Sequence, residues 1–326
     1  MYSDLPNWLS PVLVLCGLYV LAKASDAFVD GAAAVARALG ISPFIIGMVV
    51  IGFGTSAPEL CVSALSGISG HASLSLGNAY GSCVFNIAAI LGVAALIRPI
   101  AVKRSAVWLA GPLLFALSAG SLYLLRDANC TRTDAAILIA AFAVIMPVYC
   151  IIDQKLSGAP GADPQQAGEG SAAPLGRAVA KLAAGLALLV GSSYILVWGA
   201  VDVARALGVS ELMIGVTIVA VGTSLPELAS AVASARRGEH EFVVGNIVGS
   251  NLFNMLAVVG IATVISPIEG FPRTVLCRDF PFLIALSASI SLFGAGGRIG
   301  KLKGLAWIAA FLAYSALVIL QETKGA

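Results

Sequence analysis

Apolar residues along this chain gather in runs of about 20, the length at which an α-helix crosses the hydrocarbon core of a bilayer. The runs are unbroken, which favours helices over the alternating ~10-residue segments of a membrane β-barrel. The pattern predicts an all-α integral membrane protein with ten transmembrane helices, at residues 10–36, 42–67, 76–98, 105–125, 133–152, 176–204, 210–235, 244–266, 278–295 and 302–321.

A polar segment interrupts this series between the fifth and sixth predicted spans. Residues 153–174 are rich in Gly, Ala, Pro, Gln and Ser, a composition typical of a flexible linker. The chain is therefore predicted to place five helices in residues 1–152 and five in residues 175–326.

One polar motif lies in the second and third spans of the first half and returns in the second half. It reads GTSAPEL at 54–60 with GNAYGSCVFN at 77–86, and GTSLPEL at 222–228 with GNIVGSNLFN at 245–254. Every matched position lies 168 residues further along the chain, as Gly222 does from Gly54. Because each half has an odd number of spans, the second copy must enter the membrane from the opposite face. The sequence thus predicts two inverted five-helix repeats, a common transporter construction with substrate bound near the midplane.

Composition supports a lipid environment and excludes several classes of function. Of 326 residues, 59% are hydrophobic and 11% are charged, against roughly 25% charged in an average soluble domain. The net charge of +2, without a Lys/Arg-rich run, predicts no nucleic-acid partner. Six cysteines stand singly in apolar surroundings and are interpreted as small buried hydrophobes rather than as disulfides or a metal cluster. The first apolar stretch lacks a positive leader and is longer than a signal-peptide core, so it is interpreted as a span.

The Lys and Arg residues that flank the spans are distributed unevenly. Twelve fall on one side of the predicted membrane and six on the other. The richer side is predicted to be cytoplasmic, which places both termini outside and the linker in the cytoplasm.

The repeated motif places acidic and amide side chains in the middle of predicted spans. Glu59, Asn86 and their repeat equivalents Glu227 and Asn254 are expected near the bilayer centre, where a carboxylate is costly and is generally functional. Pro58 opposes a continuous helix, so a break is expected between Gly54 and Pro58. Carboxylates beside freed carbonyls and hydroxyls suit Na⁺ or Ca²⁺, whereas a His/Cys set would suit Zn²⁺ or Cu⁺.

The same residues also fit a purely structural role. Ser56-Ala57-Pro58-Glu59 also fits a capping box, with Ser as the N-cap and Glu at the third helical position, and residues 224–227 repeat it. The two roles are compatible, because a cap can fix the position of a ligand. In the third span, Asn78, Ser82 and Asn86 are spaced four residues apart and share one helix face.

At these residues the sequence resembles the cation/calcium exchanger superfamily, specifically the bacterial and archaeal sodium/calcium exchangers. Both alpha-repeat motifs, G-T-S-x-P-E and G-N-x-x-G-S-x-x-F-N, are present twice, in alpha regions at about 42–98 and 210–266. The resemblance covers essentially the whole chain. It implies antiport of Na⁺ against Ca²⁺ by alternating access.

The resemblance also implies roles for individual residues. Glu59 and Glu227 would be the paired Ca²⁺-binding carboxylates, shared with Na⁺. The remaining cation ligands would be the hydroxyl or backbone oxygens of Thr55, Ser56, Ser82, Thr223, Ser224 and Ser250, with Asn86 and Asn254 completing the central ring. The K⁺-dependent relatives are among those with Asp at the position of Asn254, so this residue favours K⁺ independence. The short linker predicts no separate calcium-sensing domain.

Other functions remain open at this stage. A buried glutamate pair can also carry protons, so a Ca²⁺/H⁺ antiporter is the alternative, and a cation channel or a membrane scaffold is the less favoured one. No phosphate loop, paired nucleophile or cofactor motif is found, so we predict neither an enzyme nor a bound cofactor. The expected partners are the transported Na⁺ and Ca²⁺ and the lipid bilayer. The protein is expected to function as a monomer in a prokaryotic inner (plasma) membrane.

Overall fold

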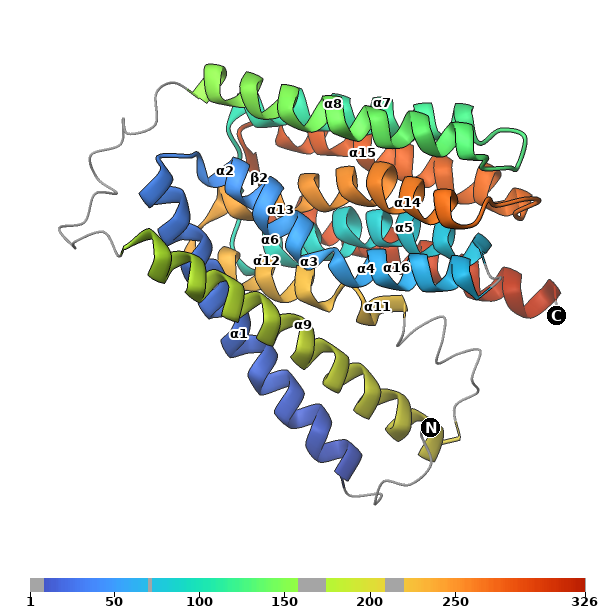
Figure 1. The fold of residues 1–326 in the computed structure, drawn as a ribbon, viewed down its shortest axis with the longest axis horizontal. Coiled ribbons are helices and arrows are strands. Elements are labelled where there is room, and N and C mark those ends of the chain that lie inside the picture. The colour runs from blue at the N-terminus through green and yellow to red at the C-terminus, as the bar shows by residue number, and fades with distance from the viewer. Residues whose placement is uncertain (1–8, 70–71, 158–173, 209–219, 326) are drawn as a thin grey trace.

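The computed structural model describes residues 9–69, 72–157, 174–208 and 220–325. Almost all of them are helical, so the predicted all-α class is confirmed (Figure 1). The first half contains α1 Leu9–Leu39, α2 Pro43–Ile45, η1 Ile46–Ile51, α3 Gly52–Thr55, α4 Ala57–Ile68, α5 Ala72–Phe85, η2 Asn86–Ile90, α6 Leu91–Ile97, β1 Ile100–Ala101, α7 Arg104–Leu124 and α8 Arg132–Ser157. The second half contains α9 Leu175–Ala206, α11 Ala220–Gly222, α12 Leu225–Arg237, α13 His240–Leu252, η4 Phe253–Val258, α14 Val259–Ile265, η5 Val275–Asp279, α15 Phe280–Gly294, β2 Arg298–Ile299 and α16 Lys301–Gly325.

The described helices account for the predicted spans as follows. Eight helices are long and apolar enough to cross a membrane, and the bent pair 43–55 and 57–68 makes a ninth. The remaining prediction, 210–235, has its first ten residues outside the described part, and its remainder forms α11 and α12. Residues 153–157 of the predicted linker continue α8, and 158–173 lie outside the described residues.

Three spans depart from regular α-helical geometry where the repeated motif lies. The second span bends by 40° at Ser56, inside the break expected between Gly54 and Pro58. The third span contains the π-helical turn η2, which begins at Asn86, and the eighth contains η4 around Asn254. A π-helical turn inserts an extra residue into a helix and is frequent at functional sites.

The helices α1 and α9 form an antiparallel pair that runs diagonally beside the other helices (Figure 1). Glycines bring the two backbones close together, since a Cβ added to Gly31 would lie 2.6 Å from the backbone nitrogen of Leu182. Gly185 of α9 meets Phe28 of α1 in the same way, at 2.7 Å. Close approach through small residues is a common way for helices to associate in lipid.

Two short backbone pairings tie the halves together outside the helices. Ile100 of β1 pairs with Ile299 of β2, and Cys130 forms a bridge with Ile268. Ile268 lies 168 residues after Ile100, so the bridge repeats the strand pair with the two halves exchanged. The crossed pairings are consistent with a two-fold relation between inverted repeats.

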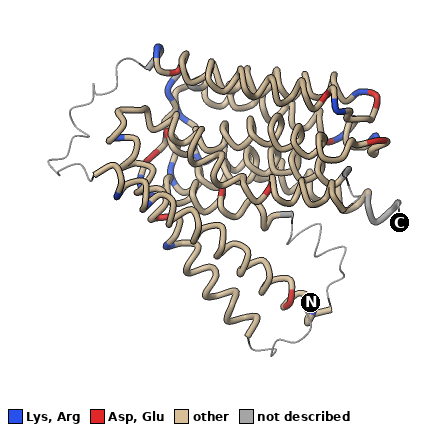
Figure 2. Tube along the Cα trace, in the orientation of Figure 1, with Lys and Arg blue, Asp and Glu red and all other residues tan. Residues whose placement is uncertain are grey.

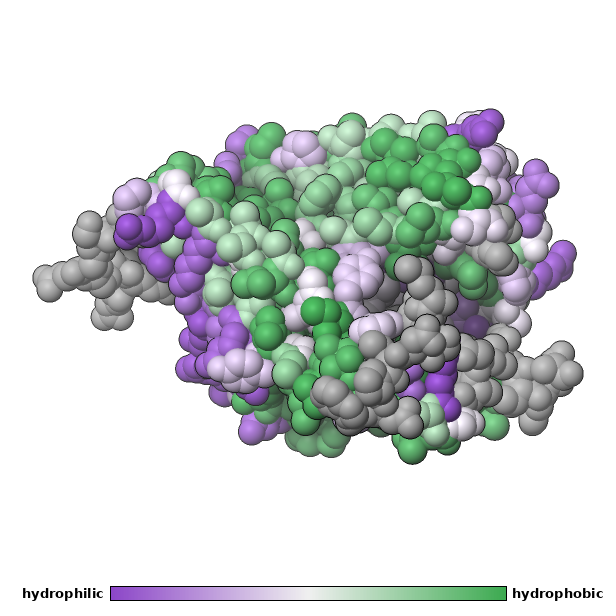
Figure 3. Space-filling view, turned by 60° about the horizontal axis from the view of Figure 1, so that its bottom comes forward, coloured by the Kyte–Doolittle hydropathy of each residue, from purple (hydrophilic) through white to green (hydrophobic). Residues whose placement is uncertain are grey.

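Burial identifies the centre of the protein and its lipid-facing rim. Within the most apolar 18-residue stretch of each span, 89% of the residues are buried in 240–265 and 72% in 74–97, against only 17% in 132–155 and 11% in 301–321. Charged residues gather at the two ends of the molecule along its long axis, apart from a few acidic positions between them (Figure 2). Hydrophobic surface covers much of the region between the ends (Figure 3). This distribution fits a protein that crosses a bilayer along its long axis.

Candidate cation site

The candidate site begins at the break in the second span. Ser56 leaves the helical conformation with φ −85° and ψ 8°, and Pro58 follows within the first turn of α4. The Thr55 hydroxyl donates to the carbonyl of Ile51 at 3.0 Å, and the Ser250 hydroxyl of the other repeat donates to the carbonyl of Gly52 at 3.2 Å. Hydroxyls from both repeats therefore satisfy carbonyl groups around the break.

The two motif serines bind the glutamates of the opposite repeat. Ser56 Oγ donates to Oε1 of Glu227 at 2.8 Å, and Ser224 Oγ donates to Oε1 of Glu59 at 2.9 Å. All four side chains are fully buried. The two carboxylates are thus held by a reciprocal pair of hydrogen bonds across the interface between the repeats.

These contacts confirm the N-cap positions of the capping-box prediction but correct its hydrogen bonding. Ser56 and Ser224 do occupy the N-cap positions of α4 and α12, but neither side chain makes a capping hydrogen bond. Each hydroxyl is instead directed across the interface to a carboxylate. In a capping box the serine oxygen would accept from a backbone N–H, whereas here the hydroxyl donates to a carboxylate, and a hydrogen bond to a charged group is stronger than a neutral one.

Two asparagines support the glutamates from behind. Asn78 Nδ2 donates to the backbone carbonyl of Glu59 at 3.1 Å and to Ser63 Oγ at 2.9 Å. In the second repeat, Asn246 Nδ2 donates to Ser230 Oγ at 3.0 Å and to the carbonyl of Glu227 at 3.4 Å. Both amides therefore fix the first turns of the helices that carry the carboxylates.

The neighbouring residues Asn86 and Asn254 are completely buried within the π-helical turns. Asn86 Nδ2 donates to Oδ1 of Asn251 at 3.2 Å, which makes Asn251 a further member of the site. The sequence prediction missed Asn251 because its equivalent in the first repeat is Cys83, so it is not among the positions that the repeats share. An amide within a repeated polar motif, in the middle of an apolar span, was the signal that could have found it.

Five buried oxygen atoms of the site have no hydrogen-bond partner among the described residues. They are Oε2 of Glu59, Oε2 of Glu227, Oδ1 of Asn86, Oδ1 of Asn254 and Oγ1 of Thr223. Burying such an atom without a partner is costly, so an unpartnered group in a native structure needs an explanation. Carboxylate, amide and hydroxyl oxygens are the ligands of hard cations such as Ca²⁺.

The other predicted ligands lie in the same buried region. Ser82 Oγ is 3.2 Å from Ser224 Oγ, and Thr55 and Ser250 are each 3.4 Å from Oδ1 of Asn246. Nine of the ten predicted site residues are buried and Thr223 is half-buried. Among the described residues no group of three His, Cys, Asp or Glu side chains is close enough to hold a metal ion. Hydroxyl and amide oxygens of both repeats thus lie in the same buried region as the glutamate pair.

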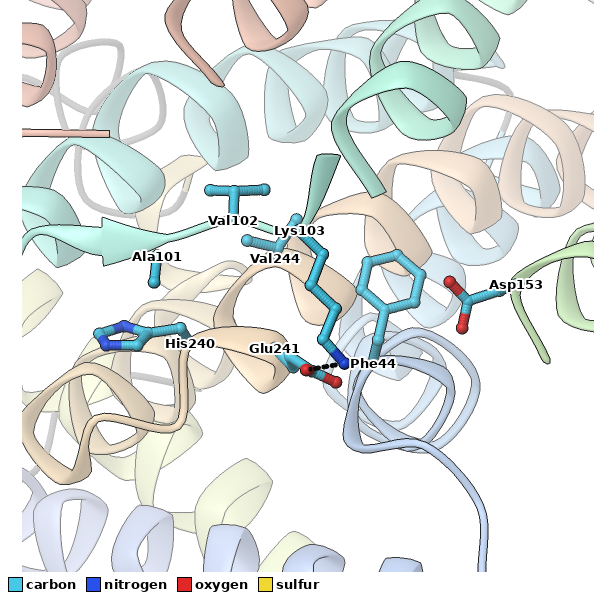
Figure 4. Close-up of a pocket in the computed structure, with 8 residues that line it drawn as sticks. All are labelled: Phe44, Ala101, Val102, Lys103, Asp153, His240, Glu241 and Val244. Atoms are coloured by element: carbon cyan, nitrogen blue, oxygen red, sulfur yellow. Dashed lines mark ion pairs between the residues drawn. The ribbon is translucent and has the colours of Figure 1, made fainter. Parts of the chain in front are cut away.

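A separate polar cluster lies where the ends of α8, α13 and the segment around β1 meet (Figure 4). Lys103 Nζ forms an ion pair with Glu241 at 2.5 Å, and buried Asp153 accepts a hydrogen bond from the Ser42 hydroxyl at 3.2 Å. These contacts join the start of the second span to neighbouring helix ends. They do not involve the glutamate pair.

The sequence and the fold both match known proteins. The family described as sodium/calcium exchanger protein matches residues 9–149 and 177–320. CaxA, a candidate antiporter of Alkalimonas amylolytica, is 38% identical over 315 residues, which cover 94% of this chain and 98% of that protein. The sodium/calcium exchanger MaX1 of Methanosarcina acetivorans is 28% identical over 95% of this chain and 97% of its own. A solved structure of the sodium-calcium exchanger NCX_Mj superimposes with a TM-score of 0.83 at 28% identity, covering 94% of this chain and 98% of the other.

Proposed function

This chain belongs to the sodium/calcium exchanger protein family, and we propose that it exchanges Na⁺ for Ca²⁺ across a membrane by alternating access. The observation that carries the proposal is the pair of buried glutamates, each held by a serine of the other repeat and each with one unpartnered oxygen. A site built from residues of both inverted repeats lies where the two halves meet. It can open to either face if the halves rearrange around it.

Exchange rather than leak follows from the charge of this site. Two buried carboxylates without a cation carry an uncompensated desolvation cost, so an empty site resists the switch between faces. Ca²⁺ would engage both Glu59 and Glu227, while Na⁺ ions would spread over the same oxygens and the neighbouring hydroxyls. The two loads therefore exclude each other, and each compensates the buried negative charge.

The antiparallel pair α1 and α9 is suited to be the moving part. Its two helices hold each other through the close glycine contacts at Gly31 and Gly185, and the pair runs at an angle to the other helices (Figure 1). None of the ten predicted ligands lies on it. The pair can therefore slide past the site as one body without carrying a ligand away.

The proposal includes the placement of the protein. It would work as a monomer in a prokaryotic inner membrane, with both termini outside and the linker in the cytoplasm, as the excess of Lys and Arg on one side indicates. Asn254 in place of an aspartate supports K⁺ independence.

The decisive test is uptake of radioactive Ca²⁺ into proteoliposomes loaded with Na⁺, compared with vesicles that hold Na⁺ on both sides. Uptake should require the outward Na⁺ gradient and should fall at least about 100-fold in Glu59→Gln and in Glu227→Gln, because each variant removes one of two carboxylates from a divalent cation. Glu241→Gln is the matched control, since it removes an acid that pairs with Lys103 away from the site.

Other outcomes would contradict the proposal. Uptake that ignores Na⁺ but follows a pH gradient would make the protein a Ca²⁺/H⁺ antiporter. Ca²⁺ flux without any counter-ion would indicate a channel, and full transport by Glu59→Gln would show that the glutamate pair is not the ion site.

A further inference from the structure

A cavity of about 330 Å³ opens between one end of α1 and the facing end of α9. Three cationic side chains, one acidic side chain and two alanines line it: Asp30, Ala34, Arg37, Arg177, Ala178 and Lys181. It lies on the face of the protein that is richer in Lys and Arg, and none of its lining residues belongs to the candidate cation site.

The shape of the cavity follows from the packing of the two helices. Gly31 and Leu182 bring the backbones together at the inner end of the cavity. Beyond this contact, the small side chains of Ala34 and Ala178 leave the space between the helices unfilled. The cavity thus forms because the alanines at this end of the α1/α9 pair are too small to fill the space between the two helices.

The charge around the cavity is positive and is only partly neutralised. Asp30 pairs with Lys181 at 2.9 Å and also with Arg237 of α12. Within the described part of the chain no ion pair is found for Arg37 or Arg177, and both side chains are exposed. Two guanidinium groups therefore remain free to bind an anion at the mouth of the cavity.

The duplication does not account for this cluster. Arg37 has an equivalent in Arg205, but the positions that match Asp30, Arg177 and Lys181 are Trp198, Leu9 and Leu13. The opposite end of the helix pair thus has Asp202 and Arg205 but no equivalents of Arg177 and Lys181. The basic pair Arg177 and Lys181 therefore belongs to one face of the membrane only, as a ligand specific to that face would require.

We propose that this cavity binds the phosphate headgroup of an anionic phospholipid from the leaflet on that face. Arg matches phosphate with two parallel hydrogen bonds, and basic pockets between membrane helices bind such headgroups. Exposed apolar side chains continue from the cavity along α9 towards its middle, with Val179 46% and Leu188 56% exposed. They offer a surface for an acyl chain, which a free phosphate would not need.

A bound lipid would connect the ends of α1 and α9 and would move with the pair. The inference depends on the chain spanning a membrane and not on which ions it exchanges, so lipid binding and ion transport can fail separately. It is tested on the full-length purified protein by native mass spectrometry, in which retained phosphatidylglycerol is counted against phosphatidylcholine.

The variant Arg37→Gln/Arg177→Gln should weaken phosphatidylglycerol retention by roughly 10- to 30-fold, because it removes the two guanidinium groups that would contact the headgroup phosphate directly. Lys155→Gln/Lys301→Gln is the matched control: it removes the same charge from exposed positions on the same face and should change retention less than about twofold. Ala34→Leu should also weaken retention by filling the cavity while keeping every charge.

Three results would overturn the inference. The first is an equal loss in the control and in the Arg37/Arg177 variant, which would mean only general attraction to anionic lipid. The second is unchanged phosphatidylglycerol retention both in Ala34→Leu and in the Arg37/Arg177 variant. The third is displacement of the lipid by millimolar inorganic phosphate at constant ionic strength, which would make the cavity a site for soluble anions.

Discussion

The crossed pairs Ser56–Glu227 and Ser224–Glu59 allow each hydroxyl to be tested against a correct and an incorrect partner. Ser56 precedes Glu59 by one helical turn, yet its hydrogen bond runs 2.8 Å to Glu227, and Ser224 reaches Glu59 at 2.9 Å. All four side chains are fully buried. A buried hydrogen bond contributes about 1 kcal/mol between neutral groups and about 1.5–3 kcal/mol when one group is ionised.

Double-mutant cycles convert this geometry into a measurable difference. Each serine is replaced by Ala and each glutamate by Met, which has a similar length but no comparable acceptor. The crossed cycles, Ser56→Ala with Glu227→Met and Ser224→Ala with Glu59→Met, should give coupling energies of about 1–3 kcal/mol. The uncrossed cycles, which pair each serine with the glutamate of its own repeat, should give values at least about 1 kcal/mol smaller.

The measurement is the free energy of unfolding in mixed micelles, with a large organic cation in place of Na⁺ and Ca²⁺ so that ion binding does not enter. The uncrossed cycles are matched controls, because they contain the same four substitutions in different combinations. Equal coupling in all cycles, or stronger coupling within each repeat, would refute the crossed arrangement. Stronger coupling within each repeat would favour a local contact between each serine and the glutamate of its own motif.

Three further predictions concern the surroundings of the site. Asn251→Ala should weaken the apparent Na⁺ or Ca²⁺ affinity in vesicle flux by about tenfold, while Cys83→Ala at the matching position should change it less than about twofold. Gly249→Ala should lower the free energy of unfolding by about 1–3 kcal/mol, because a Cβ there meets the backbone of η1. The control Gly120→Ala, on the exposed side of α7, should leave the free energy of unfolding unchanged or raise it by up to about 1 kcal/mol. Burial raises the pKa of the Cys130 thiol to about 11. In a variant without the other cysteines, the alkylation rate of Cys130 should therefore still rise about tenfold per pH unit between about pH 8 and about pH 10. An alkylation rate that levels off below this pH range would contradict the burial of the thiol.

Much of the fold could be predicted because long apolar runs have few alternatives in a membrane. Each span needs about 20 residues to satisfy its backbone internally, so span positions follow from hydropathy alone. The exact repetition from Gly54 to Gly222 then showed that the halves are related. The burial of Glu59 and Glu227 was predictable for the same reason, since both lie within apolar runs.

The details that were missed depend on contacts between residues far apart in the chain. The capping box at Ser56 is a local sequence pattern, whereas the carboxylate that the Ser56 hydroxyl binds belongs to Glu227, 171 residues away. The π-helical turns at Asn86 and Asn254 add a residue to a helix without changing which residues are apolar, so hydrophobic patterning does not reveal them. Asn251 was overlooked because comparison of the repeats highlights what they share, and here the second repeat differs from the first.

The crossed hydrogen bonds also set an order of events during synthesis. Ser224 follows Glu59 by 165 residues, so at the usual 5–20 residues per second a ribosome delivers it roughly 10 to 30 s later. During this interval the second span is complete, but the Glu59 carboxylate lacks the Ser224 hydroxyl that binds it in the finished fold. Until the second half is inserted, the Glu59 carboxylate must therefore be stabilised by the insertion machinery or by water at the bilayer surface.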